Sequence, residues 1–458
     1  MSVGETGSIT DSSSYGPGAF DAHRPPDEAL LGDCVHCGFC LPTCPTYVLW
    51  GEEMDSPRGR LYLMKEGLEG AAMSESMVEH WDNCLGCMAC VTSCPSGVRY
   101  DTLIEQTRAQ VERHHRRAPS EKALRALIFA LFPYPARLRL LRGPLRAMQR
   151  TGLDRALRRT GLLERMAPHL AAMERLAPPL EKAERLPRRV PAVGTRRATV
   201  GLITGCVQDA FFPEVNAATA RVLAAEGCDV VVPLHQSCCG ALSVHNGREA
   251  EAERLARRTI DTFEQAGVDV VVINAAGCGS TLKDYARLLA DDPAYAVRAR
   301  DFQGKVRDIS EVLTDLGPVA ERHPLPVTVA YHDACHLAHA QGIRDQPRRL
   351  LAGIPGLQVR EIAEPELCCG SAGIYNILRP EASRDLGDRK AANIAATGAE
   401  VLVTANPGCL LQVTSAFSRQ GERGPTMGMA HLVEVLDASI RGLAPDRLRA
   451  QRSGRSTS

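Results

Sequence analysis

From residue 198 onward, short apolar runs rich in β-branched residues alternate with longer amphipathic stretches. The runs at 198–204, 229–233 and 268–274 have the length and composition of buried strands. The stretches at 214–226 and 247–266 repeat apolar residues at helical spacing. Strands that alternate with helices form parallel sheets covered on both faces. This part of the chain is therefore predicted to be α/β.

Before this part, the spacing of apolar residues is that of helices. Ser56-Pro57 is typical of a helix start, and Leu61, Met64 and Leu68 follow it at helical spacing. A second helix is predicted over residues 74–82. Residues 29–110 are thus expected to be α-helical.

Residues 118–197 are rich in Arg, Leu and Ala and are interrupted by prolines. One predicted helix places four apolar residues on a single face: Leu124, Leu127, Ile128 and Leu131. Each proline is expected to end a helix; these are Pro133, Pro135, Pro144, Pro168, Pro178, Pro179, Pro187 and Pro191. We expect a helical linker that offers a surface to a partner subunit and ends in an exposed tether over 187–197.

Composition narrows the class of protein. Of the 458 residues, 44% are hydrophobic, and the formal net charge is zero, so nothing draws the whole chain to nucleic acid. Aromatic residues make up only 4%, which argues against base-stacking surfaces. No apolar run is long enough for a transmembrane helix. The 17 cysteines are odd in number and clustered, which favours reduced, metal-binding thiolates and a cytoplasmic protein.

Eight of the cysteines form two identical runs of Cys-x-x-Cys-x-x-Cys-x-x-x-Cys-Pro. In two-cluster ferredoxins the fourth cysteine of each run binds the cluster of the other run. We therefore predict two [4Fe-4S] clusters with crossed ligands. The first would be held by Cys34, Cys37, Cys40 and Cys94, and the second by Cys84, Cys87, Cys90 and Cys44. Zinc sites or disulfides are the alternative, but structural zinc motifs use paired Cys-x-x-Cys units.

Eight further cysteines form an internal repeat around two Cys-Cys-Gly sequences. The first copy contains Cys206, Cys238, Cys239 and Cys278, and the second contains Cys335, Cys368, Cys369 and Cys409. Single cysteines follow apolar runs, so they are placed at strand ends, where open α/β sheets bind ligands. Each set is a candidate site for a further iron–sulfur cluster or for zinc. The alternative is that some are buried apolar residues, as is expected for the isolated Cys228.

Other polar residues near these motifs have two interpretations each. His332, His336 and His339 surround Cys335, and each is either an acid, base or cluster-polarising group or a hydrogen-bonding residue of a loop. His235 and His245 flank the first Cys-Cys-Gly sequence and have the same two interpretations. Arg58 and Arg60 either compensate the charge of a cluster or are solvated arginines near a helix start. No catalytic residue is identified.

These patterns predict six segments. We expect a flexible N-terminus over 1–28, an α-helical ferredoxin domain over 29–117, and a helical linker over 118–197. Two tandem α/β Cys-Cys-Gly domains follow over 198–322 and 323–441, and a flexible C-terminus covers 442–458. The fold class is therefore α plus α/β.

Several stretches resemble the iron–sulfur subunits of glycolate oxidase, within a wider group that includes heterodisulfide reductase subunits. The resemblance rests on Cys34–Cys40, Cys44–Tyr47, Pro57–Arg60, Cys94–Tyr100, Asn216–Leu223, Cys368–Gly373 and Thr404–Cys409. It implies a chain that accepts electrons from an FAD-containing partner that oxidises glycolate or another 2-hydroxyacid. The electrons would pass to a quinone or another acceptor. Contact with the inner face of the cell membrane would be made through partners.

Two observations bear on other functions. No G-x-G-x-x-G sequence follows a predicted strand, so no dinucleotide site is expected in this chain. In heterodisulfide reductase the module ends in a further Cys-x-x-Cys, but Cys278–Thr281 and Cys409–Gln412 lack its last cysteine. A thiol–disulfide oxidoreductase is therefore the less favoured alternative. Iron–sulfur subunits of lactate or glycerol-3-phosphate dehydrogenases, and a zinc-binding scaffold, are the others.

Overall fold

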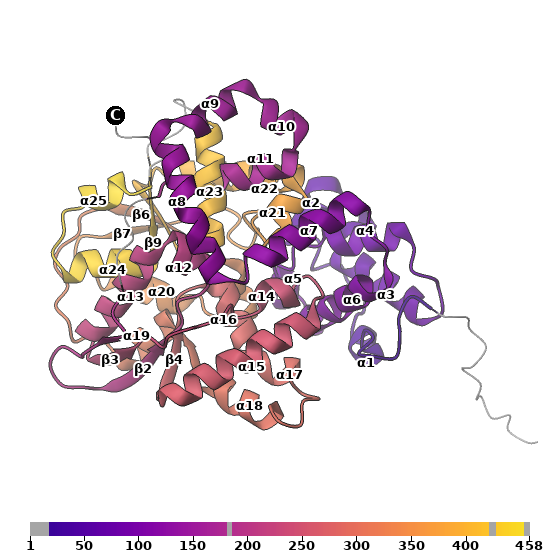
Figure 1. Cartoon of the computed structure of the whole chain (residues 1–458), viewed down its shortest axis with the longest axis horizontal. Coiled ribbons are helices and arrows are strands. Elements are labelled where there is room, and N and C mark those ends of the chain that lie inside the picture. The colour runs from indigo at the N-terminus through magenta and orange to yellow at the C-terminus, as the bar shows by residue number, and fades with distance from the viewer. Residues whose placement is uncertain (1–17, 181–185, 421–426, 453–458) are drawn as a thin grey trace, which may run out of the picture.

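The structure is a computed structural model that describes residues 18–180, 186–420 and 427–452. The chain forms a helical N-terminal domain, an arch of linker helices and two α/β modules (Figure 1). The predicted fold class is thus confirmed. The expectations of flexibility for residues 1–17 and 453–458 lie outside the described residues.

The N-terminal domain is entirely helical between residues 28 and 114. Its elements are α1 (Glu28–Gly32), α2 (Pro45–Trp50), η1 (Glu53–Asp55), α3 (Pro57–Leu68), α4 (Glu75–Asn83), α5 (Ala89–Thr92) and α6 (Tyr100–His114). Ser56 caps α3 by accepting a hydrogen bond from Gly59 N, and Ser74 caps α4 in the same way. Trp81 and Met64 are fully buried in the core between these helices.

Residues 18–27 pack against this domain, which differs from the flexible N-terminus expected up to residue 28. Ala19 is buried, and Gln110 of α6 donates hydrogen bonds to Asp21 and to the carbonyl of His23. Arg24 forms a salt bridge of 2.6 Å with Asp291 of the first α/β module. These contacts hold the segment across two domains.

The linker consists of α7 (Pro119–Leu131), α8 (Pro135–Thr151), α9 (Leu153–Thr160), α10 (Leu162–Met166) and α11 (Pro168–Arg175). Pro119, Pro135 and Pro168 start helices, where the missing N–H costs nothing. Pro144 lies inside α8, so the expectation that each proline ends a helix is wrong there. Figure 1 shows α8 beside α12 and the remaining arch over α21 and α22.

The first module is built on a five-stranded sheet in the order β1-β3-β2-β4-β5. Its elements are β1 (Arg189–Val190), β2 (Ala198–Leu202), α12 (Val207–Phe211), α13 (Pro213–Ala225), β3 (Cys228–Val231), α14 (Ala241–Val244), α15 (Glu249–Ala266), β4 (Val270–Ile273), α16 (Ala276–Leu282), α17 (Tyr285–Leu288), α18 (Ala296–Lys305), β5 (Val306–Asp308) and α19 (Ile309–Leu316). Strands β2 to β5 are parallel, as predicted. The expected tether over 187–197 instead contributes β1, which pairs antiparallel with β3.

The second module has a parallel four-stranded sheet in the order β7-β6-β8-β9. Its elements are β6 (Thr328–His332), η2 (His336–Ala340), α20 (Asp345–Ala352), β7 (Gln358–Glu361), α21 (Tyr375–Leu378), α22 (Pro380–Ala395), β8 (Val401–Thr404), α23 (Pro407–Arg419), β9 (Gly428–His431), α24 (Leu432–Ile440) and α25 (Asp446–Ala450). In both modules the chain leaves a central strand (β2 or β6), forms one neighbour and then crosses to the other side. Such a switch point is where open α/β sheets bind ligands.

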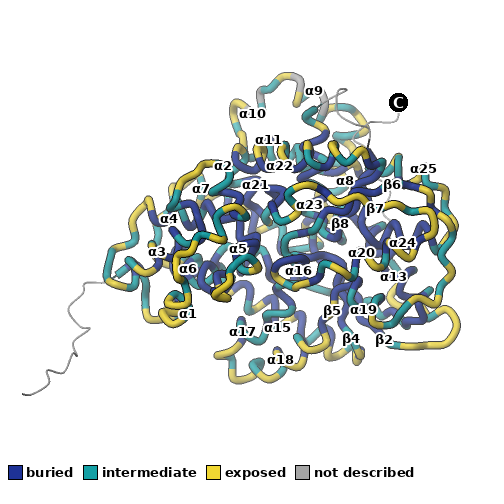
Figure 2. The backbone as a smooth tube through the Cα atoms, turned by 180° about the vertical axis from the view of Figure 1, so that it is seen from behind, coloured by how far each residue is buried: buried dark blue, intermediate teal, exposed yellow. Residues whose placement is uncertain are grey.

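The two modules share one continuous hydrophobic core, visible as the buried centre of the tube in Figure 2. Arg221 of α13 forms a salt bridge of 2.8 Å with Asp437 of α24, and His431 Nε2 lies 2.7 Å from the carbonyl oxygen of Asn274. The expected flexible C-terminus differs over residues 442–452. Leu448 is buried, and Arg452 pairs with Glu434 at 2.8 Å.

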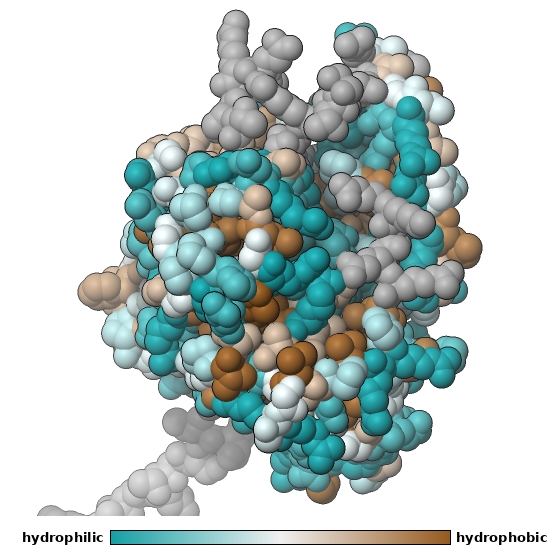
Figure 3. Space-filling view, turned by 90° about the vertical axis from the view of Figure 1, so that its left-hand side faces the viewer, coloured by the Kyte–Doolittle hydropathy of each residue, from teal (hydrophilic) through white to brown (hydrophobic). Residues whose placement is uncertain are grey.

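The end of the molecule that carries the two sheets is mainly hydrophilic. On this face, apolar side chains form small separate areas among polar ones (Figure 3). Among the described residues, no helix is long and apolar enough to cross a membrane.

Candidate iron–sulfur and cysteine sites

All 17 cysteines are free thiols, so none is consumed in a disulfide. In the N-terminal domain, burial raises the pKa of Cys34, and the nearby thiols of Cys94 and Cys37 raise it further. Burial also raises the pKa of Cys90 well above its usual value, as do neighbouring Cys87 and Cys84. Cys34 therefore lies near a cysteine of the other run, which is the arrangement that crossed ligation requires.

The eight thiols differ in their access to solvent. Cys44, Cys84, Cys87 and Cys90 are buried, whereas Cys34, Cys40 and Cys94 are half-buried and Cys37 is exposed. One predicted ligand set is thus wholly buried, and the other reaches the surface. Soft thiolates at these spacings suit iron–sulfur clusters, and the free, clustered donors of this domain fit such groups.

Of the two arginines singled out in the sequence, Arg60 faces the buried cysteines. Its side chain is 1% exposed, pairs with Asp55 at 2.9 Å and places Nη1 4.0 Å from Cys44 Sγ. Burial raises the pKa of Cys84, but the positive charges of Arg60 and Arg108 outweigh this and lower it. Arg58 instead pairs with Glu53 at 2.6 Å near the surface.

The four cysteines of the first Cys-Cys-Gly set come together at the ends of β2 and β4. Cys206 Sγ lies 3.6 Å from Cys238 Sγ, and Cys239 is within hydrogen-bonding contact of Cys238 and Cys278. Gly240 follows with φ +87°, a left-handed conformation that side-chain-bearing residues rarely adopt. This turn lets both adjacent thiols reach the same site, which a regular strand would forbid.

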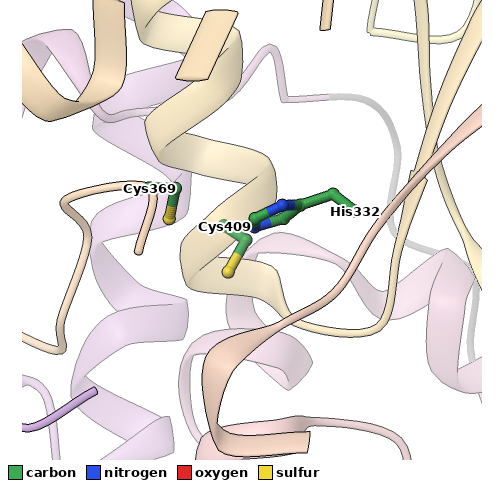
Figure 4. Close-up of side chains that lie close together, drawn as sticks. All are labelled: His332, Cys369 and Cys409. Atoms are coloured by element: carbon green, nitrogen blue, oxygen red, sulfur yellow. The ribbon is translucent and has the colours of Figure 1, made fainter. Parts of the chain in front are cut away.

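The second set is built in the same way, at the ends of β6 and β8. Hydrogen-bonding contacts link Cys368 to Cys335 and to Cys369, and Cys369 to Cys409. His332, at the end of β6, joins this set: its ligand atom and those of Cys369 and Cys409 lie within 4.8 Å of one another (Figure 4). Burial, with the nearby charge of Lys390, lowers the pKa of His332 to about 3, so its imidazole is neutral at pH 7.

Two of the other histidines tie the second module to the N-terminal domain. His336 Nε2 lies 2.9 Å from the carbonyl oxygen of Gly86, and His339 Nδ1 lies 2.7 Å from Thr92 Oγ1. These contacts match the hydrogen-bonding interpretation, although the partners come from another domain. The sequence offers no local signal for them, because the paired residues are about 250 positions apart.

His245 and His235 have different positions in the first module. His245 Nδ1 lies 3.0 Å from Glu105 of α6, and its ring contacts that of His336 edge to face. His235 has a positive φ of 58° in the loop after β3. His245 therefore belongs to the same domain interface as His336 and His339.

A direct apolar contact joins the buried ferredoxin thiols to the second Cys-Cys-Gly set. Leu85 and Cys87 share one hydrophobic cluster with Leu367 and Cys368, against which Cys335 packs. The nearby Cys335 thiol is also among the groups that raise the pKa of Cys87, after the larger effect of burial. No comparable cluster includes a cysteine of the first set together with a ferredoxin cysteine among the described residues.

Both Cys-Cys-Gly sets line one cavity of about 600 Å³. The loops that carry them are joined by a hydrogen bond of 3.1 Å from Ala276 N to the carbonyl of Ala405. The linker contributes Arg125 and Glu174 to the lining, and otherwise mainly apolar side chains, namely Leu131, Phe132, Leu138, Leu141, Pro144, Leu145, Met148, Met173 and Leu176. Leu141 and Pro144 are also exposed, so the cavity reaches the surface at α8. Sequence reasoning did not predict this cavity, because it forms only when distant segments meet.

These sites define a class: an iron–sulfur protein with a helical ferredoxin-like domain and a duplicated cysteine-rich module. Family models agree with each part. A "4Fe-4S dicluster domain" matches residues 31–98, a "Cysteine-rich domain" matches 200–283 and 329–414, and a "Glycolate oxidase iron-sulfur subunit, linker region" matches 120–177.

Whole-chain relatives make the assignment more specific. A probable glycolate oxidase iron–sulfur subunit of Bacillus subtilis is 40% identical over 90% of this chain and 94% of its own length. The glycolate oxidase iron–sulfur subunit of Escherichia coli is 34% identical over 90% and 95%. Lactate utilization protein A of an Exiguobacterium species is 32% identical over 53% of this chain and 98% of its own. The chain belongs to the family of glycolate oxidase iron–sulfur subunits, which confirms the resemblance found in the sequence.

Proposed function

We propose that this chain carries electrons from a flavoprotein that oxidises glycolate, or a related 2-hydroxyacid, to an acceptor bound beside the Cys-Cys-Gly sets. Its family membership supports the role of an electron-transfer subunit. The observation that carries the route is the shared apolar cluster of Cys87, Cys368 and Cys335. It brings thiols of the ferredoxin domain and of the second module into one buried contact region.

We assign Cys34, Cys37, Cys40 and Cys94 to one [4Fe-4S] cluster and Cys84, Cys87, Cys90 and Cys44 to the other. Bound clusters would supply one-electron redox chemistry. The chain's own residues exclude water from the buried ferredoxin set of Cys84, Cys87, Cys90 and Cys44. Arg60 places a positive charge 4.0 Å from Cys44 Sγ. Such a charge favours the more negative, reduced form of a nearby cluster.

The surface around Cys37 supports the cluster of Cys34, Cys37, Cys40 and Cys94 as the point where electrons enter. Cys37 is exposed, and its neighbours Val35 and Phe39 are 68% and 66% exposed. Large apolar side chains at a surface are typical of protein–protein contacts. We propose that the FAD-containing partner covers this surface and thereby shields the ferredoxin cysteines around Cys37 from water.

The cavity supports an apolar, planar acceptor such as a quinone. Its linker wall is mostly apolar, and it reaches the surface at α8 while the cysteines line its inner end. Residues 135–166 contain nine arginines and only two acidic residues, a net charge of +7 in a chain of zero net charge. A basic, amphipathic surface of this kind attracts anionic lipid. This supports a cytoplasmic protein whose linker touches the inner face of the membrane, where a quinone can enter.

The test is quinone reduction by the purified complex with its flavoprotein partner. We expect glycolate-dependent reduction of a soluble quinone to fall at least tenfold in Cys87→Ser. The control is Cys228→Ser, which should leave the rate unchanged, because Cys228 is buried at the start of β3 and pairs with Ala198, at the end of β2 opposite Cys206. Equal rates in wild type and Cys87→Ser would exclude the proposed route.

A further inference from the structure

The two Cys-Cys-Gly modules are not equivalent, because the second has a histidine at the end of its central strand, where the first has an apolar residue. His332 Nε2 is buried and has no hydrogen-bond partner among the described residues. One nitrogen of its ring and the thiols of Cys369 and Cys409 all lie within 4.8 Å of one another. Figure 4 shows the three side chains approaching one another from the end of β6, the Cys-Cys-Gly loop and the start of α23.

The internal repeat identifies what the first module has at this position. Cys335 corresponds to Cys206 with an offset of 129, so His332 corresponds to Ile203. Ile203 is buried in the same hydrophobic cluster as Cys238 and Cys239. An apolar side chain is therefore compatible with this position in the fold, and the imidazole of the second module is not needed for packing.

A second buried polar residue of the second module likewise has an isoleucine as its counterpart in the first. Lys390 of α22 is fully buried near Cys368 and Cys369, and with an offset of 130 its counterpart is Ile260. Lys390 Nζ donates a hydrogen bond of 2.6 Å to the carbonyl of Glu364. At these two positions the second module thus has a nitrogen donor and a cation, whereas the first has isoleucines.

The distances suit ligands of one metal. Zinc binds sulfur at about 2.3 Å, so two thiolates on one tetrahedral ion stand about 3.8 Å apart, and a nitrogen ligand stands slightly closer. Three donors within 4.8 Å need little movement to reach this arrangement. A buried polar atom without a partner normally has a ligand or water that satisfies it. A metal is the partner that thiols and a neutral imidazole would share.

We propose that His332 Nε2 binds a thiophilic metal together with Cys369 and Cys409, either a zinc ion or an iron of a cluster. The second module would then hold a centre with mixed sulfur and nitrogen ligands, and the first would have sulfur ligands only. The proposal concerns metal binding by this chain alone and stands whether or not the chain passes electrons to a quinone.

The experiment is spectroscopy on the full-length chain, purified without oxygen from cells fed ¹⁵N-histidine. X-ray absorption at the zinc and iron edges identifies the metal, and pulsed electron paramagnetic resonance detects histidine nitrogen on a paramagnetic iron centre. We expect one nitrogen ligand on zinc or a ¹⁵N coupling on iron. His336 is not a competing donor, because its two nitrogens lie within 3 Å of Ser280 Oγ and the Gly86 carbonyl.

The matched variants are His332→Ile, which copies the first module, and Cys206→Ser, which alters only the first set. His332→Ile should remove the nitrogen signal and lower the metal content by one centre per chain. Cys206→Ser should retain the nitrogen signal. A wild-type protein without any nitrogen ligand on zinc or iron would overturn the proposal, even if His332→Ile failed to fold. Unchanged metal content and spectra in a folded His332→Ile would overturn it as well.

Discussion

The buried ion pair between Arg60 and Asp55 offers a quantitative test of the N-terminal domain. Both side chains are almost fully buried beside the ferredoxin cysteines, and Arg60 also donates hydrogen bonds to Thr46 and to the carbonyl of His80. Replacing Arg60 by leucine leaves the Asp55 carboxylate buried without its main partner. Breaking such a pair from one side typically costs about 3–5 kcal/mol.

The lower end of that range is expected here. Asp55 keeps two other neighbours, His80 Nδ1 at 3.2 Å and Asn83 Nδ2 at 3.3 Å. They compensate part of the carboxylate's lost interaction. We therefore expect Arg60→Leu to lower the free energy of unfolding of this domain by about 3 kcal/mol. Adding Asp55→Asn should restore roughly half of the loss, because the unpaired charge is then removed.

Urea unfolding followed by tryptophan fluorescence measures this quantity. The chain has two tryptophans, Trp50 and Trp81, and both lie in the N-terminal domain, so the signal reports on that domain. The control is Arg58→Leu, whose partly exposed pair with Glu53 should contribute less than 1 kcal/mol. A loss below about 1 kcal/mol for Arg60→Leu, or no recovery in the double variant, would refute the reasoning.

Three further predictions concern separate parts of the molecule. Burial raises the pKa of Asp308 to about 6, so the folded state holds this proton more tightly and stability falls as pH rises from about 4 to 6. Asp308→Asn, which keeps the α19 cap, should therefore stabilise the protein by up to about 3 kcal/mol at pH 7 but not at pH 4 in urea titrations. An equal effect at both pH values would contradict this. Leu145→Trp should fill the cavity and raise the KM for a soluble quinone about tenfold. Leu140→Trp, at a 78% exposed position that does not line the cavity, should leave this KM unchanged. Equal KM values for the two variants would argue against this acceptor site. Replacing Val35 and Phe39 by serine should weaken binding of the flavoprotein partner at least tenfold in a titration. Val297→Ser, at a similarly exposed position, should have no effect. Unchanged affinity in the Val35 and Phe39 variant would place the partner elsewhere.

The sequence predicted those features that depend on local spacing. The two cysteine runs and the offset of about 130 residues between the Cys-Cys-Gly copies are visible in one dimension. The alternation of apolar runs likewise predicted the parallel strands around β2 and β6. Such patterns survive because each element must bury its own apolar face.

Features that depend on contacts between distant segments were missed. The cavity wall comes from the linker and its floor from both modules. The bond between His336 and Gly86 joins residues whose order in the chain says nothing about their proximity. Pro144 was misjudged because an internal proline can bend a helix without ending it, and α8 continues past Pro144 to Thr151. His332 could have been singled out among three histidines by comparison with Ile203 in the aligned repeat.

The central claim is that electrons leave the buried ferredoxin set through the contact between Cys87 and the second module. Rapid-freeze electron paramagnetic resonance on the chain with its flavoprotein partner, started with glycolate, tests it most directly. In the wild type, centres in the N-terminal domain should be reduced first, followed by any redox-active centre of the second module. In Cys87→Ser the reduction of the second module's centre should slow at least tenfold, while the ferredoxin cluster at Cys34, Cys37, Cys40 and Cys94 is still reduced. Unchanged reduction of the second module in that variant would contradict the account.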